Sequence, residues 1–232
     1  MRVPPPSARA RRVARTARAD DVVAAARLVL ERDGIDGLTM RSVADELRIK
    51  APSLYKHVAG KGAIEIELMS VALAEMGEAL HTALDATGTT AAADSCAPAD
   101  AHGDDTNGNR ADGDTHGVTN GGNDGGPERQ IAALLAAYRR HALAHPNMYR
   151  LATAGRLPWD ELPAGLEGWA GAPFVTVTGD PHRGQALWSY AHGMVILELD
   201  GRYPDGSDLD QTWAEGAGAF AGIVGGSEPR RG

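Results

Sequence analysis

The segment of residues 38–61 constrains the fold of this chain more than any other stretch. It reads LTMRSVADELRIKAPSLYKHVAGK. Thr39 is a good helix N-cap, and the apolar residues that follow it mark one face of a short helix. Pro52 suits the first turn of a second helix, because the N–H that proline lacks has no helical partner there. Two short helices joined by a turn over 48–50 predict a helix-turn-helix.

The second short helix combines an apolar inner face with a polar outer face. Leu54 and Val58 are four residues apart, so we expect both to point inward. The outer residues are polar, aromatic or cationic: Lys50, Ser53, Tyr55, Lys56 and His57. Such a set is typical of a helix that enters the major groove of DNA.

The segment also resembles the DNA-binding domain of the TetR family of bacterial transcriptional regulators, over about residues 18–80. The resemblance implies an all-α protein with a three-helix DNA-binding head and a helical ligand-binding and dimerisation domain. Arg48 stands where the family usually has a turn glycine, and Gly62 where an acidic residue usually opens the next helix. The matching residues are Gly37, Leu38, Thr39, Arg41, Val43, Ala44, Leu47, Ser53 to Val58 and Lys61.

We expect the DNA contacts to come from this motif. Tyr55 and Lys61 are assigned to the phosphate backbone, where contacts fix the register. Ala51 and Pro52 could contact a thymine methyl group, and Arg41 could reach a guanine or a phosphate. The full set of expected DNA-contacting residues is Arg41, Lys50, Ala51, Pro52, Ser53, Tyr55, Lys56, His57 and Lys61.

Charge is distributed unevenly along the chain. The net charge is −8, yet residues 1–61 hold ten arginines and three lysines against seven acids, which leaves the remainder at −14. A basic head on an acidic body favours a DNA partner. Residues 1–17 are predicted to be a disordered basic arm, and we leave open whether this arm contacts DNA or is only solvated.

Several classes of protein are disfavoured by the composition. The single cysteine, Cys96, cannot form an internal disulfide, which suits the cytoplasm. No apolar run approaches the ~20 residues that a membrane span needs. His141 and His145 have a spacing that can hold a metal, but an exposed pair is the favoured interpretation. With no catalytic constellation in the sequence, we expect no enzyme activity, no cofactor and no metal.

The rest of the chain is predicted to be helical, apart from one insertion. Helices are expected at 19–33, 63–84, 128–145, 181–199 and 208–224, with a short helix from Pro146. The stretch 155–180 contains FVTVT, but an irregular helix is favoured because a lone strand would have no partner. Residues 87–127 are rich in Gly, Asp, Asn and Thr, and are expected to be a disordered insertion in the C-terminal domain, 81–226.

The C-terminal half carries the expected effector and dimer sites. Trp188 with His192-Gly193 resembles the signature of one TetR subgroup, and the helices near 181–199 and 208–224 are expected to pair between two copies of the chain. Seven residues could line a ligand pocket or simply pack as core: Tyr138, Tyr149, Trp159, Trp169, Phe174, Trp188 and His192.

These observations favour a sequence-specific transcriptional regulator, with a repressor preferred. It would bind a near-palindromic double-stranded DNA operator as a homodimer and respond to a small-molecule effector. One alternative is a helical small-molecule binding protein or enzyme with a vestigial DNA-binding head. Another is a DNA-binding protein with no small ligand that is regulated through the insertion.

Overall fold

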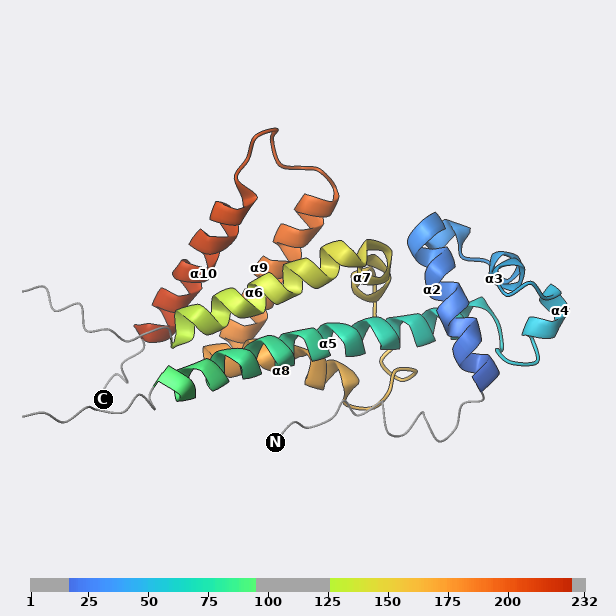
Figure 1. Ribbon diagram of the computed structural model, residues 1–232, viewed down its shortest axis with the longest axis horizontal. Helices are drawn as coiled ribbons and strands as arrows, with labels where there is room; N and C mark the ends of the chain where they lie inside the picture. Colours follow the sequence, from blue (N-terminus) through green and yellow to red (C-terminus); the bar gives the residue numbers. More distant parts are fainter. Residues whose placement is uncertain (1–16, 95–125, 227–232) are drawn as a thin grey trace, which may run out of the picture.

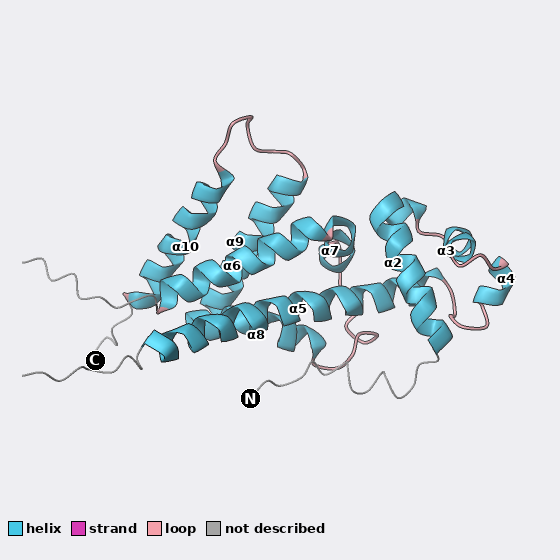
Figure 2. Cartoon of the chain, in the orientation of Figure 1, coloured by secondary structure: helices cyan, strands magenta, loops and turns pink. Residues whose placement is uncertain are grey.

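The protein folds entirely into helices wherever its structure is described. The computed structural model describes residues 17–94 and 126–226, and every regular element in these two ranges is helical (Figure 2). This confirms the predicted all-α class. A small group of helices lies at one end of the molecule and a larger group at the other, with helix α5 running between them (Figure 1).

The N-terminal group consists of α2 (Ala17–Gly37), α3 (Met40–Glu46) and α4 (Ala51–Leu54). The sequence predicts that the first helix ends at Gly34, and α2 is kinked at that residue (φ 72°, ψ −175°). Glycine is favoured at this kink because a side chain disfavours positive φ. The kink turns the chain toward Thr39 and the helix-turn-helix.

Helix α5 (Lys61–Asp94) is longer than the sequence predicts. Its 34 residues correspond to ~51 Å of helix at 1.5 Å per residue. The expected insertion at 87–127 therefore begins too early, because residues 87–94 continue the helix. Thr87 is buried, its hydroxyl donates to the Leu84 carbonyl, and the alanines at 91–93 are strong helix formers. Residues 95–125 of the expected insertion lie outside the described residues.

The C-terminal helices follow the predicted order. The segment 166–178 is helical despite its strand-like composition, as expected. Phe174 and Val177 are buried at helical spacing, and the Thr176 and Thr178 hydroxyls donate to carbonyls four residues earlier. The five helices are α6 (Pro127–Ala144), α7 (Pro146–Thr153), α8 (Leu166–Thr178), α9 (Pro181–Leu199) and α10 (Leu209–Gly225).

Two clusters of buried apolar side chains organise these helices. The N-terminal cluster combines residues of α2, α3 and α4 with Leu68 of α5, and it also includes Met148 and Ala152 of α7. The C-terminal cluster is built from α6, α8, α9 and α10, together with Leu80 of α5. Helix α5 therefore contributes to both clusters, and α7 reaches from the C-terminal half into the N-terminal cluster.

A close helix crossing in the C-terminal half requires a glycine. A Cβ added to Gly77 of α5 would lie 2.4 Å from Cζ3 of Trp169 and 3.0 Å from the Cα of Ala170, both in α8. Such distances are too short for any side chain. The absence of a Cβ at Gly77 is thus what lets α5 and α8 approach.

We predict that Gly77→Ala destabilises the protein. The added methyl group overpacks the α5–α8 contact, which costs about 1–3 kcal/mol of the free energy of unfolding. Gly88→Ala is the matched control, because a Cβ there meets nothing within 4 Å and the helix propensity of alanine is better. Urea denaturation of both variants would measure the difference, and equal midpoints would contradict this account of the contact.

Candidate nucleic-acid interface

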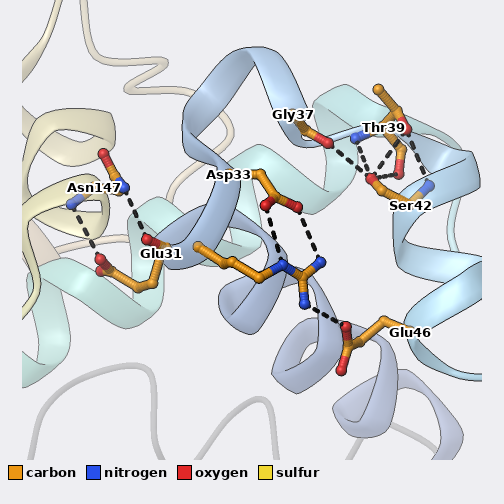
Figure 3. A network of polar contacts seen from close by, with 8 residues as sticks. Glu31, Asp33, Gly37, Thr39, Ser42, Glu46 and Asn147 are labelled. Atoms are coloured by element: carbon orange, nitrogen blue, oxygen red, sulfur yellow. Dashed lines mark hydrogen bonds and ion pairs between the residues drawn. The ribbon is translucent and has the colours of Figure 1, made fainter.

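The first helix of the helix-turn-helix is fixed by a capping box. The Ser42 N–H donates to Oγ1 of Thr39 over 3.0 Å, and the Thr39 N–H donates to Oγ of Ser42 over 2.9 Å. The Ser42 hydroxyl also lies 2.8 Å from the Gly37 carbonyl oxygen (Figure 3). These bonds satisfy backbone groups that a helix start leaves without partners, so the predicted N-cap is confirmed and α3 has a defined beginning.

The turn of the motif carries backbone strain at Arg48. Its φ is 54°, and it is the only residue other than glycine with positive φ in the described part of the chain. The turn is closed by the Ile49 N–H, which donates to the Ala44 carbonyl over 2.9 Å. The position at which the sequence departs from the family's glycine thus keeps the left-handed conformation that glycine adopts without steric cost.

Helix α4 is short but firmly anchored. Leu54 is fully buried and Val58 packs against the N-terminal cluster, as predicted. The regular helix ends at Leu54, so Tyr55, Lys56 and His57 lie in the turn that follows. The N–H groups of His57 and Val58 both donate to the Leu54 carbonyl, at 2.9 and 3.2 Å, which continues the helical course of the backbone.

The expected DNA-contacting residues in α4 and beside it are mostly exposed. Lys50, Pro52, Lys56 and His57 are exposed, and Tyr55 keeps 58% of its surface accessible despite its large aromatic ring. Ala51 and Ser53 are half-buried at the start of α4. Arg41 is exposed on α3, with its Nε 3.8 Å from Oδ2 of Asp45. An exposed tyrosine among cations is suited to contact with phosphates.

Lys61 is placed differently from the other expected contacts. It opens α5, and its Nζ donates to the Ile35 carbonyl over 3.2 Å while lying 3.6 Å from Oε1 of Glu65. An ammonium group has three donors, so these interactions leave capacity for a phosphate. Lys61 therefore ties α5 to the end of α2 while its side chain stays exposed.

Net positive charge is concentrated on the helix-turn-helix rather than on α2. Arg32 on α2 is paired with Asp33 and Glu46, and its hydrogen bond lowers the pKa of Asp33 (Figure 3). Residues 17–61 carry eight cations against seven acids, whereas 41–61 carry five cations against two acids. Much of the charge surplus over 1–61 thus comes from five arginines ahead of residue 17, which lie outside the described residues.

A contact that the sequence does not reveal joins α2 to α7. The Glu31 carboxylate accepts the Met148 N–H at 2.9 Å through Oε1 and the Asn147 N–H at 3.2 Å through Oε2. In return, the Asn147 amide donates to the Glu31 carbonyl over 3.0 Å (Figure 3). A carboxylate at a helix N-terminus satisfies free N–H groups and complements the helix dipole. The cap comes from a residue more than 110 positions away along the chain.

Five of the seven expected ligand-pocket residues contact one another at the C-terminal cluster, to which Tyr138, Tyr149 and Phe174 belong. The Tyr138 and Tyr149 hydroxyls are 2.9 Å apart, and the Tyr149 hydroxyl is 2.7 Å from Nδ1 of His192. Phe174 packs edge-on against Tyr138, and Trp188 stacks on His192. Burial raises the pKa of Tyr138 to about 12. Tyr138, Tyr149 and Phe174 are buried in the packing of the cluster, whereas Trp188 is 41% exposed.

The other two aromatic residues lie apart from this group. Trp159 is 50% exposed in the loop between α7 and α8. Trp169 stacks on His81 of α5, with ring centroids 4.8 Å apart, and its carbonyl oxygen contacts Nε2 of that histidine. The expected seven-residue set therefore does not form a single site.

An open groove with a volume of about 840 Å³ lies between α5 and α6, beside α2. Its wall on α5 includes several alanines and Thr82, and its charged and titratable lining residues are Arg27, Glu75, Glu78, Arg140, His141 and His145. The rings of the two histidines are 5.1 Å apart. Within the described ranges, no group of three or more His, Cys, Asp or Glu side chains could hold a metal ion.

Two family models match this chain. The model for bacterial regulatory proteins of the tetR family matches residues 22–67, and the model for the tetracyclin repressor-like C-terminal domain matches residues 131–220. The chain belongs to the TetR family. It is therefore a DNA-binding transcriptional regulator, and the matched N-terminal residues contain the whole helix-turn-helix.

Individual relatives support this assignment. The chain is 39% identical to the class E tetracycline repressor of Escherichia coli over 56 residues, which are 24% of this chain and 26% of that protein. It is 27% identical over 196 residues to an uncharacterized HTH-type transcriptional regulator of Mycobacterium tuberculosis, covering 80% of this chain and 72% of the relative. A solved structure of a Rhodococcus protein of unknown function shares the fold at 18% identity, with a TM-score of 0.64 over 91% of this chain and 97% of that one.

Among the described residues, no helix of this TetR-family chain is both long enough and apolar enough to cross a membrane. Of the residues expected from the sequence to contact DNA, Ala51 and Ser53 are half-buried and the others are exposed, on a motif whose inner face is buried.

We predict that Arg48→Gly stabilises the protein. Glycine removes the steric cost of the left-handed conformation, so the free energy of unfolding should rise by about 1 kcal/mol. The matched control is Arg140→Gly, which places a glycine within helix α6 and should lower stability by about 1 kcal/mol. Urea denaturation compares the two variants. A loss of stability in Arg48→Gly would contradict the strain at this turn.

We predict that Glu31→Ala weakens the attachment of α7 to α2. The variant leaves two N–H groups of α7 without their acceptor, which costs about 1–2 kcal/mol of unfolding free energy. Glu31→Gln keeps an acceptor oxygen and should lose less. Denaturation midpoints of the two variants separate these outcomes, and equal midpoints for Glu31→Ala and the parent protein would show that the cap contributes nothing.

Proposed function

We propose that this TetR-family regulator is a homodimeric repressor that binds a near-palindromic operator and releases it when a small molecule binds. The observation that carries the proposal is the exposed group of Tyr55, Lys56 and His57 on a helix-turn-helix whose buried face is complete. Residues with no role in packing, gathered on the outer face of such a motif, are explained by contact with DNA.

The DNA contacts divide between reading and positioning. The start of α4, from Lys50 to Ser53, enters the major groove, where Ala51 and Pro52 offer apolar contact to thymine methyl groups. Tyr55 and Lys61 bind phosphates on either side of the groove, and Arg41 reaches the same strand from α3. The exposure of Tyr55, Lys50 and Arg41 supports this arrangement.

The two apolar clusters support a division of labour between two domains. We propose residues 18–80 as the DNA-binding domain and residues 81–226 as the ligand-binding and dimerisation domain, with α7 packed across the boundary. The dimer forms through α9 and α10, which expose the large apolar side chains of Trp188, Leu197 and Ile223. The pair of helices is held in place by Arg139 of α6, which bonds Glu198 of α9 and Asp210 of α10.

Dimerisation sets the form of the operator. A two-fold symmetric dimer presents two α4 elements, so its half-sites should repeat about one turn of DNA (~34–36 Å) or a multiple of it apart. The class E tetracycline repressor shares the N-terminal motif, and its name gives both a repressor and a small molecule. On this basis we propose that the present protein represses and that it responds to a small-molecule effector. As its partner is chromosomal DNA, the protein would act in the cytoplasm.

A vestigial head is disfavoured as an alternative. An unused head would have no reason to keep a capped α3, a fully buried Leu54 and an exposed tyrosine among cations. An enzyme that merely carries such a head would retain these features only by chance. The structure therefore favours the regulator over a helical enzyme or carrier.

The proposal is tested by the DNA affinity of Tyr55→Ala. Fluorescence anisotropy with DNA from the region upstream of the gene, across a salt series, should show tight binding to one palindrome and weak, salt-sensitive binding to scrambled DNA. We expect Tyr55→Ala to weaken operator binding about tenfold or more, since a lost phosphate or base contact costs about 1–3 kcal/mol. The unfolding midpoint should not change, because the side chain is largely exposed.

The matched control is Leu28→Ala in α2. Leu28 is as exposed as Tyr55, at 59%, but it belongs to the helix that does not read DNA. Its removal should leave operator affinity unchanged. If both variants bind like the parent protein, or if operator and scrambled DNA bind equally across the salt series, the placement of the DNA contacts on α4 and the turn after it is wrong.

A further inference from the structure

The groove between α5 and α6 is a cavity from which a ligand could act on both halves of the molecule. Its lining brings Arg27 of α2, which belongs to the DNA-binding domain, together with residues of the ligand-binding domain. Helices α5 and α6 run side by side away from α2 (Figure 1). Its volume of about 840 Å³ lies within the range of about 300–1,000 Å³ typical of ligand sites.

The groove is polar at the end near α2 and apolar farther along. Arg27, Arg140, His141 and His145 lie near the α2 end, where α6 approaches α7. Along α5 the wall continues through Ala79, Thr82, Ala83 and Ala86, where alanine methyl groups predominate. From position 74 to 86 this wall extends ~18 Å at 1.5 Å per residue. Such a shape suits an elongated molecule with one polar end.

The polar end offers cationic donors that are only partly used. Arg27 donates through Nη1 to Oε1 of Glu75 over 2.6 Å, and this is its only side-chain bond within the described ranges. A guanidinium has five N–H donors in a planar fork that matches a carboxylate. Arg140 is exposed beside the groove and forms no ion pair with another residue described by the structure. Both side chains can therefore accept an additional anion.

The two histidines are suited to the same role. Burial, followed by the charge of His145, lowers the pKa of His141, so His141 is neutral near pH 7. A neutral imidazole offers one N–H donor without adding charge. The lining carries the guanidinium groups of Arg27 and Arg140 and the carboxylates of Glu75 and Glu78, so an anion is favoured only where it reaches the two arginines and the imidazole donors.

We propose that this groove binds an elongated organic carboxylate, whose carboxylate competes with Glu75 for the Arg27 guanidinium while its apolar body lies along the alanine wall of α5. This inference rests on the proposed function only in treating the ligand as the effector. Binding exchanges one carboxylate for another on Arg27, so the ion pair between α2 and α5 opens as the ligand enters. The site thereby joins ligand recognition to a contact of the DNA-binding domain.

The proposal predicts effects of opposite sign from the two members of the ion pair. Arg27→Gln removes the guanidinium and leaves Glu75 to repel a carboxylate, so binding should weaken. Glu75→Gln removes the competing carboxylate and should strengthen binding. Arg140→Gln should weaken binding, while Arg129→Gln, an exposed arginine of the same helix outside the groove, is the matched control and should change nothing.

The test measures the affinities of octanoate and octan-1-ol for the full-length protein by isothermal titration calorimetry without DNA. The ratio of the two affinities reports recognition of the carboxylate, because any general distortion of the groove affects both ligands. We expect the ratio to fall about tenfold or more in Arg27→Gln and in Arg140→Gln, as expected for loss of a charge-assisted hydrogen bond. It should rise in Glu75→Gln and stay constant in Arg129→Gln.

Three results would overturn the proposal: no saturable binding of octanoate to the parent protein, a ratio that is the same in all variants, or tighter binding of octylamine than of octanoate. Operator affinity with and without octanoate is measured separately. Octanoate binding that follows the expected ratios in a protein that fails to recognise its operator would refute the proposed function and leave the groove assignment standing. Operator recognition without any octanoate binding would refute the groove assignment and leave the proposed function standing.

Discussion

The arrangement of this protein depends on the continuity of helix α5. The same helix supplies Leu68 to the N-terminal cluster and Leu80 to the C-terminal cluster, so the two cores share one rigid backbone. Two side-chain contacts add to this connection: Glu31 caps α7, and Arg27 pairs with Glu75. Both contacts come from α2, the helix that also supports the helix-turn-helix. A displacement of α5 or α7 relative to α2 would therefore also change the position of α3 and α4, which carry the expected DNA contacts.

Local chemistry explains why much of the fold could be predicted from the sequence. Thr39 was recognisable as an N-cap because capping needs only a hydroxyl at the right position, and Gly34 as a helix end because few other residues tolerate positive φ. Leu54 and Val58 were assigned to the inner face by their spacing alone. The segment 166–178 needed one further argument, that a single strand has no partner, to outweigh its β-branched composition.

Features that depend on distant pairs were not visible in the sequence. The bond from Glu31 to α7 joins residues more than 110 positions apart, and nothing near Glu31 marks it as a cap. Trp169 was grouped with the other aromatic residues, but Gly77 admits it to a separate contact with α5. The extension of α5 to Asp94 was missed because a weakly apolar composition does not exclude a helix that is already nucleated. The groove likewise combines residues from three helices, none of them unusual by itself.

The hydroxyl groups of Tyr138 and Tyr149 form a short hydrogen-bonded chain that ends on His192. When the imidazole carries its proton on Nε2, Nδ1 accepts from the Tyr149 hydroxyl, and Tyr149 can in turn accept from Tyr138. When the proton is on Nδ1, the same two contacts run in the opposite direction. Burial lowers the pKa of His192, which favours the neutral imidazole on which this choice depends. The tautomer of one histidine on α9 thus orients the hydroxyl groups of tyrosines on α6 and α7.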